Sequence, residues 1–554
     1  MEDRAGSQRG FWRVLRIVYT TLFALLILGI TALSYAVGFT VIPLGIIAVG
    51  PYGILTLYHL FLQLRLAPRN TKQIQYLEEK ADVTGFRPTF GLSVVGRREH
   101  RILFQKCLES VRAITYEKLE KVIVVSDGNE EEDLYMADIF REVMDGTVIV
   151  VDFILRRALL SVKNAQQAIE KAEAEIQSAT ELIQRLQIEL PEISSWVMRL
   201  FAESQISFAQ LRQEKAESLK AEALAIREEY QAKIDDLYAR VDAAGKYCMI
   251  LQPWGLKRKA MYTSLLLLAS KYQLTGTTDS DSIIAPDAVS RSVKVFVDRQ
   301  VYAMTGAVGI FNITNWLSFL SSLRYWYAFF LERAAQSAKG VVQCVSGPWG
   351  VYLSEKLLLI LDEWVDQLFM GNEMVAGDDR RLTSLMLGLG GKVLFHPFVR
   401  VLTETPISFW RWIKQQIRWA RSFFREAFLA IPTLFIQSLY MTYDLLFQSA
   451  FPLFLFYSIL SLFFDAVFRG SYVGIVTMFI TVLFGGVVRA TYAIRTTGRW
   501  RFIVYPLYGV LMYVPGLLPA KIGGLLTIWY AGWGTSMRVD MTHIKEGEQS
   551  GDDF

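Results

Sequence analysis

The segment at residues 375–383 reads VAGDDRRLT and sets two adjacent carboxylates, Asp378 and Asp379, between a glycine and two arginines. A carboxylate can take the proton from an attacking hydroxyl group, and a glycine lets another group approach closely. Adjacent aspartates also occur at helix N-termini, where the helix dipole favours negative charge. The same two residues can serve both roles, and the neighbouring motifs favour a catalytic role.

A second acidic motif, LTGTTDSDSI, places Asp279 and Asp281 at the end of an expected strand. Residues two apart in a strand face the same side, so the two carboxylates repel each other unless a cation joins them. Mg²⁺ or Mn²⁺ bridging a diphosphate is a good candidate. Asp127 follows another expected strand, at the edge where α/β sheets bind nucleotides, although a lone aspartate there is usually a turn former.

The elements that position these acids are those of a mixed α/β sheet. Residues 89–96 and 119–126 are short runs rich in β-branched residues, and the stretch FQKCLESVRAI between them is typical of a helix. Strand, helix and strand in this order predict the start of an α/β domain.

A helical hairpin is expected as an insert at residues 154–245, because glycine is absent from Thr147 to Ala244 and apolar residues recur every seven positions. Pro191 ends the first helix, and the second continues to about Val241. We favour a spacer over a partner-binding arm, because charged helical faces are usually only solvated. The predicted coiled-coil seam contains Ile169, Ile176, Ile183 and Leu190, with Ala172, Ala179 and Leu186 at the complementary position.

The composition predicts membrane spans, since 52% of the 554 residues are hydrophobic and the mean hydropathy is +0.28. No charged residue occurs from Ile17 to Leu64, and glycines and prolines divide this run into two spans within residues 11–64. Two further spans are expected at 444–493. The proline-rich segment at 502–538 is expected to be re-entrant or interfacial, and residues 539–554 form a polar tail.

Arginines cluster before the first span and after the fourth, which predicts that the N-terminus and the large middle region lie in the cytosol. Three cysteines without a CxxC motif suggest neither a disulfide framework nor a zinc site. The net charge of +4 is unremarkable, and no basic run interleaved with aromatic residues suggests nucleic acid as a partner.

Ten motifs, taken in their order, resemble the hyaluronan synthases, with the vertebrate members closest. These are membrane-embedded, processive family 2 glycosyltransferases related to chitin and cellulose synthases. The resemblance covers most of residues 11–538 outside the hairpin. It is carried by DGNEEEDLYMADIFREVM, WGLKRKAMYT, DSDS, WLSFLSSLRYWYAFFLERAAQS, VQCVSGPWGVY, FMGNEMVAGDDRRLT, LTETP, QQIRWARS, LLPAKIGGLLTI and AGWGTS.

The resemblance implies a cytosolic GT-A-like domain at 66–404, amphipathic interfacial helices at 405–443, and about four transmembrane helices. It implies a multi-pass plasma-membrane enzyme that polymerises hyaluronan from UDP-GlcNAc and UDP-GlcA by inverting transfer, with Mg²⁺ or Mn²⁺. The growing hyaluronan chain would cross the lipid bilayer that holds the enzyme.

The same resemblance assigns roles to individual residues. Asp379 and Asp378 would be the catalytic residues, with Asp379 as the base. Residues expected to bind the nucleotide sugar are Glu99, Asp127, Asp279, Asp281, Gln415, Arg418 and the gating-loop residues Trp533, Thr535 and Ser536, with Asp279 and Asp281 also holding the metal. Residues expected on the acceptor and priming side are Lys257, Arg258, Cys344, Gly347, Pro348 and Trp419.

The chain departs from the family in the stretch VVGRREHR, where members typically carry a Tyr-x-Glu-Asp-like sequence. Glu99 is kept, but Arg97 replaces the aromatic residue and His100 replaces the aspartate. The planar guanidinium of Arg97 can stack on a base, and His100 is interpreted as a surface residue. Vertebrate members also continue with two further spans beyond the position of Phe554, which leaves open how a polymer channel would be closed.

Two alternatives remain at this point. The acidic and QxxRW motifs are shared with synthases of other β-linked polymers, such as chitin or a capsule glycan. A catalytically impaired membrane scaffold, whose hairpin recruits partners, is the third hypothesis. The intact carboxylates favour an enzyme over such a scaffold.

Overall fold

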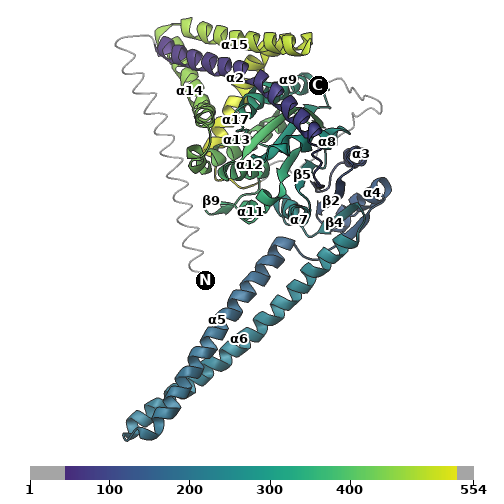
Figure 1. Ribbon diagram of the computed structural model, residues 1–554. Coiled ribbons are helices and arrows are strands. Elements are labelled where there is room, and N and C mark those ends of the chain that lie inside the picture. Colours follow the sequence, from purple (N-terminus) through teal and green to yellow (C-terminus); the bar gives the residue numbers. More distant parts are fainter. Residues whose placement is uncertain (1–43, 533–554) are drawn as a thin grey trace.

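A nine-stranded mixed sheet forms the centre of the computed structural model (Figure 1), which describes residues 44–532, with side chains from residue 53 onward. β8 is antiparallel to both β5 and β7, β6 is antiparallel to β11, and all other neighbouring strands are parallel. In spatial order the strands are β3 (Thr147–Val150), β4 (Tyr247–Gln252), β2 (Leu119–Asp127), β1 (Phe90–Gly96), β5 (Leu274–Asp279), β8 (Gly350–Leu353), β7 (Val301–Ile310), β11 (Lys392–Thr403) and β6 (Ile283–Ile284). A separate two-stranded sheet pairs β9 (Leu368–Phe369) with β10 (Asn372–Glu373).

Helices cover both faces of this sheet, which explains why β1 is buried along its whole length. Leu92 and Val94 belong to the core formed with α3 and α4, whereas Val95 and Ile123 belong to the core formed with α7. The predicted strands and the predicted helix between them are confirmed as β1, β2 and α3. The helices of the domain are α3 (Arg101–Arg112), α4 (Tyr135–Met144), α7 (Lys257–Ala269), α8 (Ala288–Ser292), α9 (Trp316–Tyr327), α10 (Ala334–Ser337), α11 (Ser354–Val365) and α12 (Asp378–Gly388). Helix α13 (Phe409–Leu429) follows in the segment expected to be interfacial.

Helix α2 (Leu44–Val83) begins in the uncharged N-terminal segment and does not end near Leu64, where the sequence suggested a boundary. It continues for another five turns and packs on the sheet. Ile74, Leu77 and Ala81 recur at helical spacing and are buried, and Ile74 and Leu77 belong to the same core as Leu92 and Val94 of β1. A single helix therefore joins the apolar segment to the central sheet.

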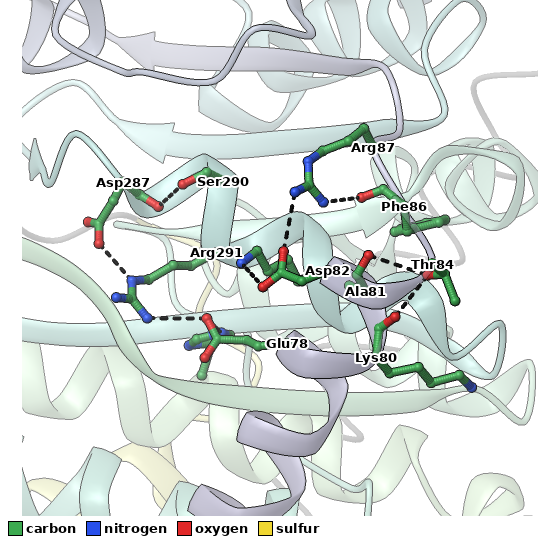
Figure 2. Close-up of polar contacts among 12 residues, drawn as sticks. Glu78, Lys80, Ala81, Asp82, Thr84, Phe86, Arg87, Asp287, Ser290 and Arg291 are labelled. Carbon is green, nitrogen blue, oxygen red and sulfur yellow. Dashed lines mark hydrogen bonds and ion pairs between the residues drawn. The ribbon is translucent and has the colours of Figure 1, made fainter.

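Ion pairs fasten the end of α2 to α8 and to the 3-10 turn that follows it, Val293–Val297 (Figure 2). Arg291 lies 2.6 Å from a carboxylate oxygen of Asp287 and 3.2 Å from one of Glu78, and Asp82 of α2 lies 2.7 Å from Lys294. These residues line a cleft of about 370 Å³. None of the expected site residues lines this cleft, so we interpret it as an anchor for α2.

The insert is an antiparallel pair of long helices, α5 (Leu155–Glu189) and α6 (Trp196–Ala243), which projects away from the domain (Figure 1). The expected hairpin is present, and its predicted seam is confirmed in part. Ile169, Ala172, Ala179 and Leu186 are buried, whereas Ile176, Ile183 and Leu190 are only partly buried. Small side chains allow the two helices to approach closely. Buried alanines recur every seven residues in both helices, at Ala165, Ala172 and Ala179 and at Ala202, Ala209, Ala216 and Ala223.

The base of the hairpin belongs to the core of the domain. Leu155, Leu237 and Val241 are buried with residues of β2 and β4. The ammonium group of Lys121 in β2 donates hydrogen bonds of 2.6 Å to the carbonyl oxygens of Val241 and Ala244. Only the distal part of the insert can therefore act as a spacer.

Excising residues 167–226 and joining Gln166 to Arg227 with a short flexible linker is expected to leave folding and synthesis largely intact. The two flanking side chains already lie side by side, with Arg227 donating a 3.0 Å hydrogen bond to Gln166. Deleting 155–244 is instead expected to prevent folding, because it removes core residues. Size-exclusion profiles and polymer synthesis of both variants test this, and loss of activity in the shorter deletion would contradict the spacer role.

Three helices after the domain are long and apolar enough to cross a membrane within the described residues. They are α14 (Leu439–Arg469), α15 (Val473–Thr497) and a composite helix at Trp500–Leu526. The composite helix contains α16 (Tyr505–Tyr508), α17 (Leu518–Leu526) and a π-helical segment at Gly509–Leu517. The re-entrant interpretation of this segment stays a prediction, and the first expected span lies outside the described residues.

Candidate active site

The carboxyl ends of neighbouring strands bring the first group of acids together. Asp127 ends β2 and Asp279 ends β5, and the register of β1 with β5 sets Val95 opposite Asp279. At the end of β1, Gly96 leaves no room for a Cβ atom against Ser280. This close approach needs glycine and brings the loop after β1, which carries Glu99, against the Asp279–Asp281 turn.

The acids around this turn affect one another electrostatically. Burial, followed by the charges of Asp279 and Glu99, raises the pKa of Asp281 to about 8. Burial and Glu99 likewise raise the pKa of Glu404 to about 7. Glu404 is a member of this neighbourhood that the sequence analysis did not single out, although it lies in the motif LTETP.

Lys257 supplies a cation to the same group, with its Nζ 2.5 Å from Oδ1 of Asp279. Burial is the largest single effect and disfavours the charged ammonium, but Asp279, Asp378 and Asp281 together raise the pKa of Lys257. The preceding residue, Leu256, has φ 78° and ψ 144°, a conformation that is costly for any residue except glycine. The turn that presents Lys257 is therefore strained.

Arg258 joins the start of α7 to the GDD segment. Its guanidinium is buried, and its Nε lies 2.8 Å from Oδ1 of Asp378. It also donates to the carbonyl oxygen of Trp364 at 3.2 Å and to the side-chain oxygen of Gln367 at 2.9 Å. These contacts hold two motifs together that are 120 residues apart in the sequence.

The two adjacent aspartates begin α12, so the helix N-terminus expected for such a pair is present. Gly377 precedes them with φ 92°, and a Cβ there would collide with Ser422 of α13. Asp378 is 7% exposed and faces Arg258, whereas Asp379 is only partly buried. The two carboxylates therefore have different surroundings.

Asp379 faces the loop expected on the acceptor side. Its Oδ2 lies 3.5 Å from the thiol of Cys344, and its Oδ1 accepts a 2.8 Å hydrogen bond from the backbone of Arg380. Burial, and then the charge of Asp379, raises the pKa of the Cys344 thiol. Cys344 is thus a neutral neighbour of the carboxylate.

The same loop reaches the strand-end acids. A Cβ at Gly347 would lie 2.6 Å from Oδ2 of Asp279, so only glycine fits this approach. The carbonyl oxygen of Pro348 accepts a 2.8 Å hydrogen bond from Thr278 in β5. Residues 344–348 therefore connect Asp379 with Asp279.

Helix α13 carries the QxxRW residues Gln415, Arg418 and Trp419. Burial lowers the pKa of Arg418, while Asp379, Asp378 and Asp279 oppose this effect in that order. The guanidinium therefore lies within the field of both acidic motifs. Trp419 is 40% exposed, and its ring centroid is 6.4 Å from that of Tyr325, a further aromatic residue that the sequence analysis did not single out.

The remaining predicted residues lie elsewhere or outside the description. His100 precedes α3 and makes no side-chain cap. Trp533, Thr535 and Ser536 lie outside the described residues. Across residues 44–532, no group of three or more His, Cys, Asp or Glu side chains is arranged to hold a metal.

Comparisons with known proteins identify the family. Residues 256–422 match the family described as "Glycosyltransferase like family 2". Hyaluronan synthase 3 of Mus musculus is 33% identical over 539 residues, covering 95% of this chain and 84% of the relative. Hyaluronan synthase 2 of Homo sapiens is 34% identical over 534 residues, with the same two coverages.

Solved structures give weaker similarity. A mannosyltransferase from Pyrobaculum calidifontis, in complex with GDP-Man and Mn²⁺, has a TM-score of 0.41 at 13% identity and covers 82% of this chain and 99% of its own. Residues 1–349 of TarS from S. aureus have a TM-score of 0.31 at 9% identity, and the match covers 80% of this chain and 90% of the TarS chain. Identification therefore depends on the sequence relatives and on the GT-A-like mixed sheet with its flanking helices. The chain belongs to the hyaluronan synthase family and is a membrane-associated family 2 glycosyltransferase.

Proposed function

We propose that this protein polymerises hyaluronan from UDP-GlcNAc and UDP-GlcA and extrudes the chain across the plasma membrane, with its catalytic domain and N-terminus in the cytosol. The observation that carries this proposal is the position of Arg418 in the field of both acidic groups, Asp279 and the Asp378–Asp379 pair. A donor diphosphate at one group and an acceptor hydroxyl at the other would meet beside this cation.

In the proposed reaction, Asp379 takes the proton from the acceptor hydroxyl as its oxygen attacks C1 of the donor sugar. The bond from C1 to the diphosphate breaks on the opposite side, so the anomeric configuration inverts. Arg418 offsets charge on the departing UDP, since a planar guanidinium suits phosphate oxygens. Trp419 gives the acceptor sugar an apolar face, and Gln415 would bind the nucleotide sugar from the same helix.

The residues present fit a divalent cation. Two carboxylates, Asp279 and Asp281, with a further acid nearby, are enough for Mg²⁺ or Mn²⁺, because such ions are often held by one or two carboxylates and substrate phosphates. Burial, and then the charges of Asp279 and Glu99, raise the pKa of Asp281, and a cation would balance those charges. When bound, the ion would neutralise charge on the diphosphate. Lys257 pairs with Asp279 in the structure described and would supply a further positive charge beside the diphosphate.

The polymer is tested by supplying membranes that contain the protein with each UDP-sugar alone and with both together. High-molecular-weight product that requires both sugars and disappears with hyaluronidase supports hyaluronan. Polymer formed from UDP-GlcNAc alone would instead indicate a chitin-type synthase. UDP release without any polymer would support an impaired enzyme.

The buried carboxyl group of Asp127 is expected to make donor binding depend on pH. Burial raises its pKa to about 6, against the effect of the 2.8 Å hydrogen bond from the backbone of Gly255. Because the raised pKa keeps the carboxyl protonated at low pH, the ionised form increases as pH rises through about 6. If that form accepts an N–H of the base, UDP affinity of the wild type, relative to Asp127→Asn, should increase about tenfold between about pH 5 and pH 7.

Calorimetric titration of both proteins with UDP checks this expectation. The variant is the necessary control, because the phosphates of UDP titrate in the same range and affect both proteins equally. If UDP affinity depends on pH in the same way in both proteins, Asp127 does not bind the base.

A further inference from the structure

The distal end of the helical hairpin carries an exposed apolar patch on α6. Only two of the residues at 196–211 are charged, whereas eight are charged at 227–243, close to the domain. Six large apolar side chains of the distal segment are 53–76% exposed, and such a cluster on a surface marks an interaction site. These six residues form the tip patch: Trp196, Val197, Leu200, Phe201, Phe208 and Leu211.

The tip patch occupies one face of α6, and α5 covers the opposite face. A helix turns by about 100° per residue, so the six side chains lie within about 140° of its circumference. Ala202 and Ala209 point in the opposite direction and are buried where the two helices meet. Helix α5 therefore leaves the patch uncovered. A spacer needs only a charged, solvated outer face, which this end of α6 replaces with apolar side chains.

Side-chain contacts hold the distal end of the hairpin in a fixed shape. The Nε of Arg212 in α6 donates a 2.7 Å hydrogen bond to Glu175 in α5. The guanidinium of Arg199 donates a 3.1 Å hydrogen bond to the carbonyl oxygen of Ile193, in the turn between the two helices. A preformed surface of this kind loses little conformational entropy when it binds a partner.

We propose that the tip patch binds the tip patch of a second copy of this chain, so that two molecules in one membrane associate through their hairpins. The hairpin projects from the end of the molecule opposite α15 (Figure 1). Two copies in one membrane therefore extend their hairpins to the same side, and a two-fold axis along that direction brings like patches together. This association does not depend on which polymer the enzyme makes.

The size and the charge of the patch both favour a second copy as the partner. Its three aromatic residues expose roughly 300–500 Å², and the three aliphatic residues bring the patch close to the about 800 Å² that each partner contributes to a stable interface. Arg199 and Glu203, the two charged residues of the segment, cancel, so like patches meet without net repulsion. An anionic lipid surface would instead require several Lys and Arg residues beside the apolar face.

Replacing both Phe201 and Phe208 by glutamate should raise the dissociation constant of the dimer about a hundred- to a thousand-fold, because unpaired carboxylates replace aromatic contacts. Gln210→Glu is the matched control, since it adds the same charge at an exposed position on another side of α6. Light scattering of the purified full-length protein across a dilution series measures the constant. All variants should make polymer at the wild-type rate per molecule, which shows that they fold.

Cross-linking in intact membranes identifies the partner. Ser204 is exposed in the middle of the patch, and all three native cysteines are buried, so Ser204→Cys supplies the accessible thiol. A short bismaleimide should yield a product of twice the mass of the chain, whereas Gln210→Cys should yield no more than a trace. Products of another mass would assign the patch to a different protein and overturn the proposal. A wild type that stays monomeric, or a dimer that persists with both glutamates, would overturn it as well.

Discussion

Asp379→Asn is expected to abolish detectable polymer, with transfer slowed by about 10²–10⁴-fold, the range that a positioned general base supplies. Asparagine keeps the size of the side chain and can still accept the 2.8 Å hydrogen bond from the backbone of Arg380. It cannot take a proton from the acceptor hydroxyl. The variant should therefore fold normally and bind UDP with unchanged affinity.

Radiolabelled sugar incorporation measures the loss, and calorimetry with UDP shows that the donor site is intact. Glu355→Gln is a suitable control, because Glu355 is an exposed acid on the neighbouring helix α11. Among the described residues it pairs only with Lys356, its neighbour in sequence, at 3.2 Å. Polymer synthesis at the wild-type rate in Asp379→Asn would reject this residue as the base.

Local sequence patterns predicted the elements that carry the donor-side acids. The β-branched runs at 89–96 and 119–126 became β1 and β2 with bounds shifted by one residue, and Asp127 and Asp279 end their strands as expected. Such runs succeed because a strand buried on both faces needs apolar residues at every position. The heptad pattern likewise predicted the hairpin, since its period is set by the two helices alone.

Features that depend on distant partners could not be predicted. The end of α2 was placed about 19 residues too early, because burial of Ile74 and Leu77 depends on a sheet formed by later residues. The pairing of Arg258 with Asp378 spans 120 residues. Its only sequence signal was the presence of both residues in recognised motifs, and nothing in those motifs indicated that the two aspartates would face different partners.

Asp378→Asn is expected to lower stability rather than to remove a chemical step. Asp378 and Arg258 are 7% and 2% exposed, so removing the anion leaves a buried guanidinium uncompensated. Breaking a buried pair costs about 3–5 kcal/mol. We expect about 3 kcal/mol, at the lower end of that range, because Gln367 and the carbonyl oxygen of Trp364 still accept hydrogen bonds from Arg258.

Thermal unfolding in detergent, measured for the two single variants and for Asp378→Asn combined with Arg258→Met, separates the pair from its surroundings. Removing both charges leaves no buried ion, so the double variant should lose less stability than the sum of the single losses, by about 1–3 kcal/mol. Additive losses would show that the pair is not coupled. If Asp378→Asn has normal stability but makes no polymer, both aspartates take part in the chemical step. The expected result instead means that Asp379 takes the proton, whereas Asp378 holds Arg258 in position.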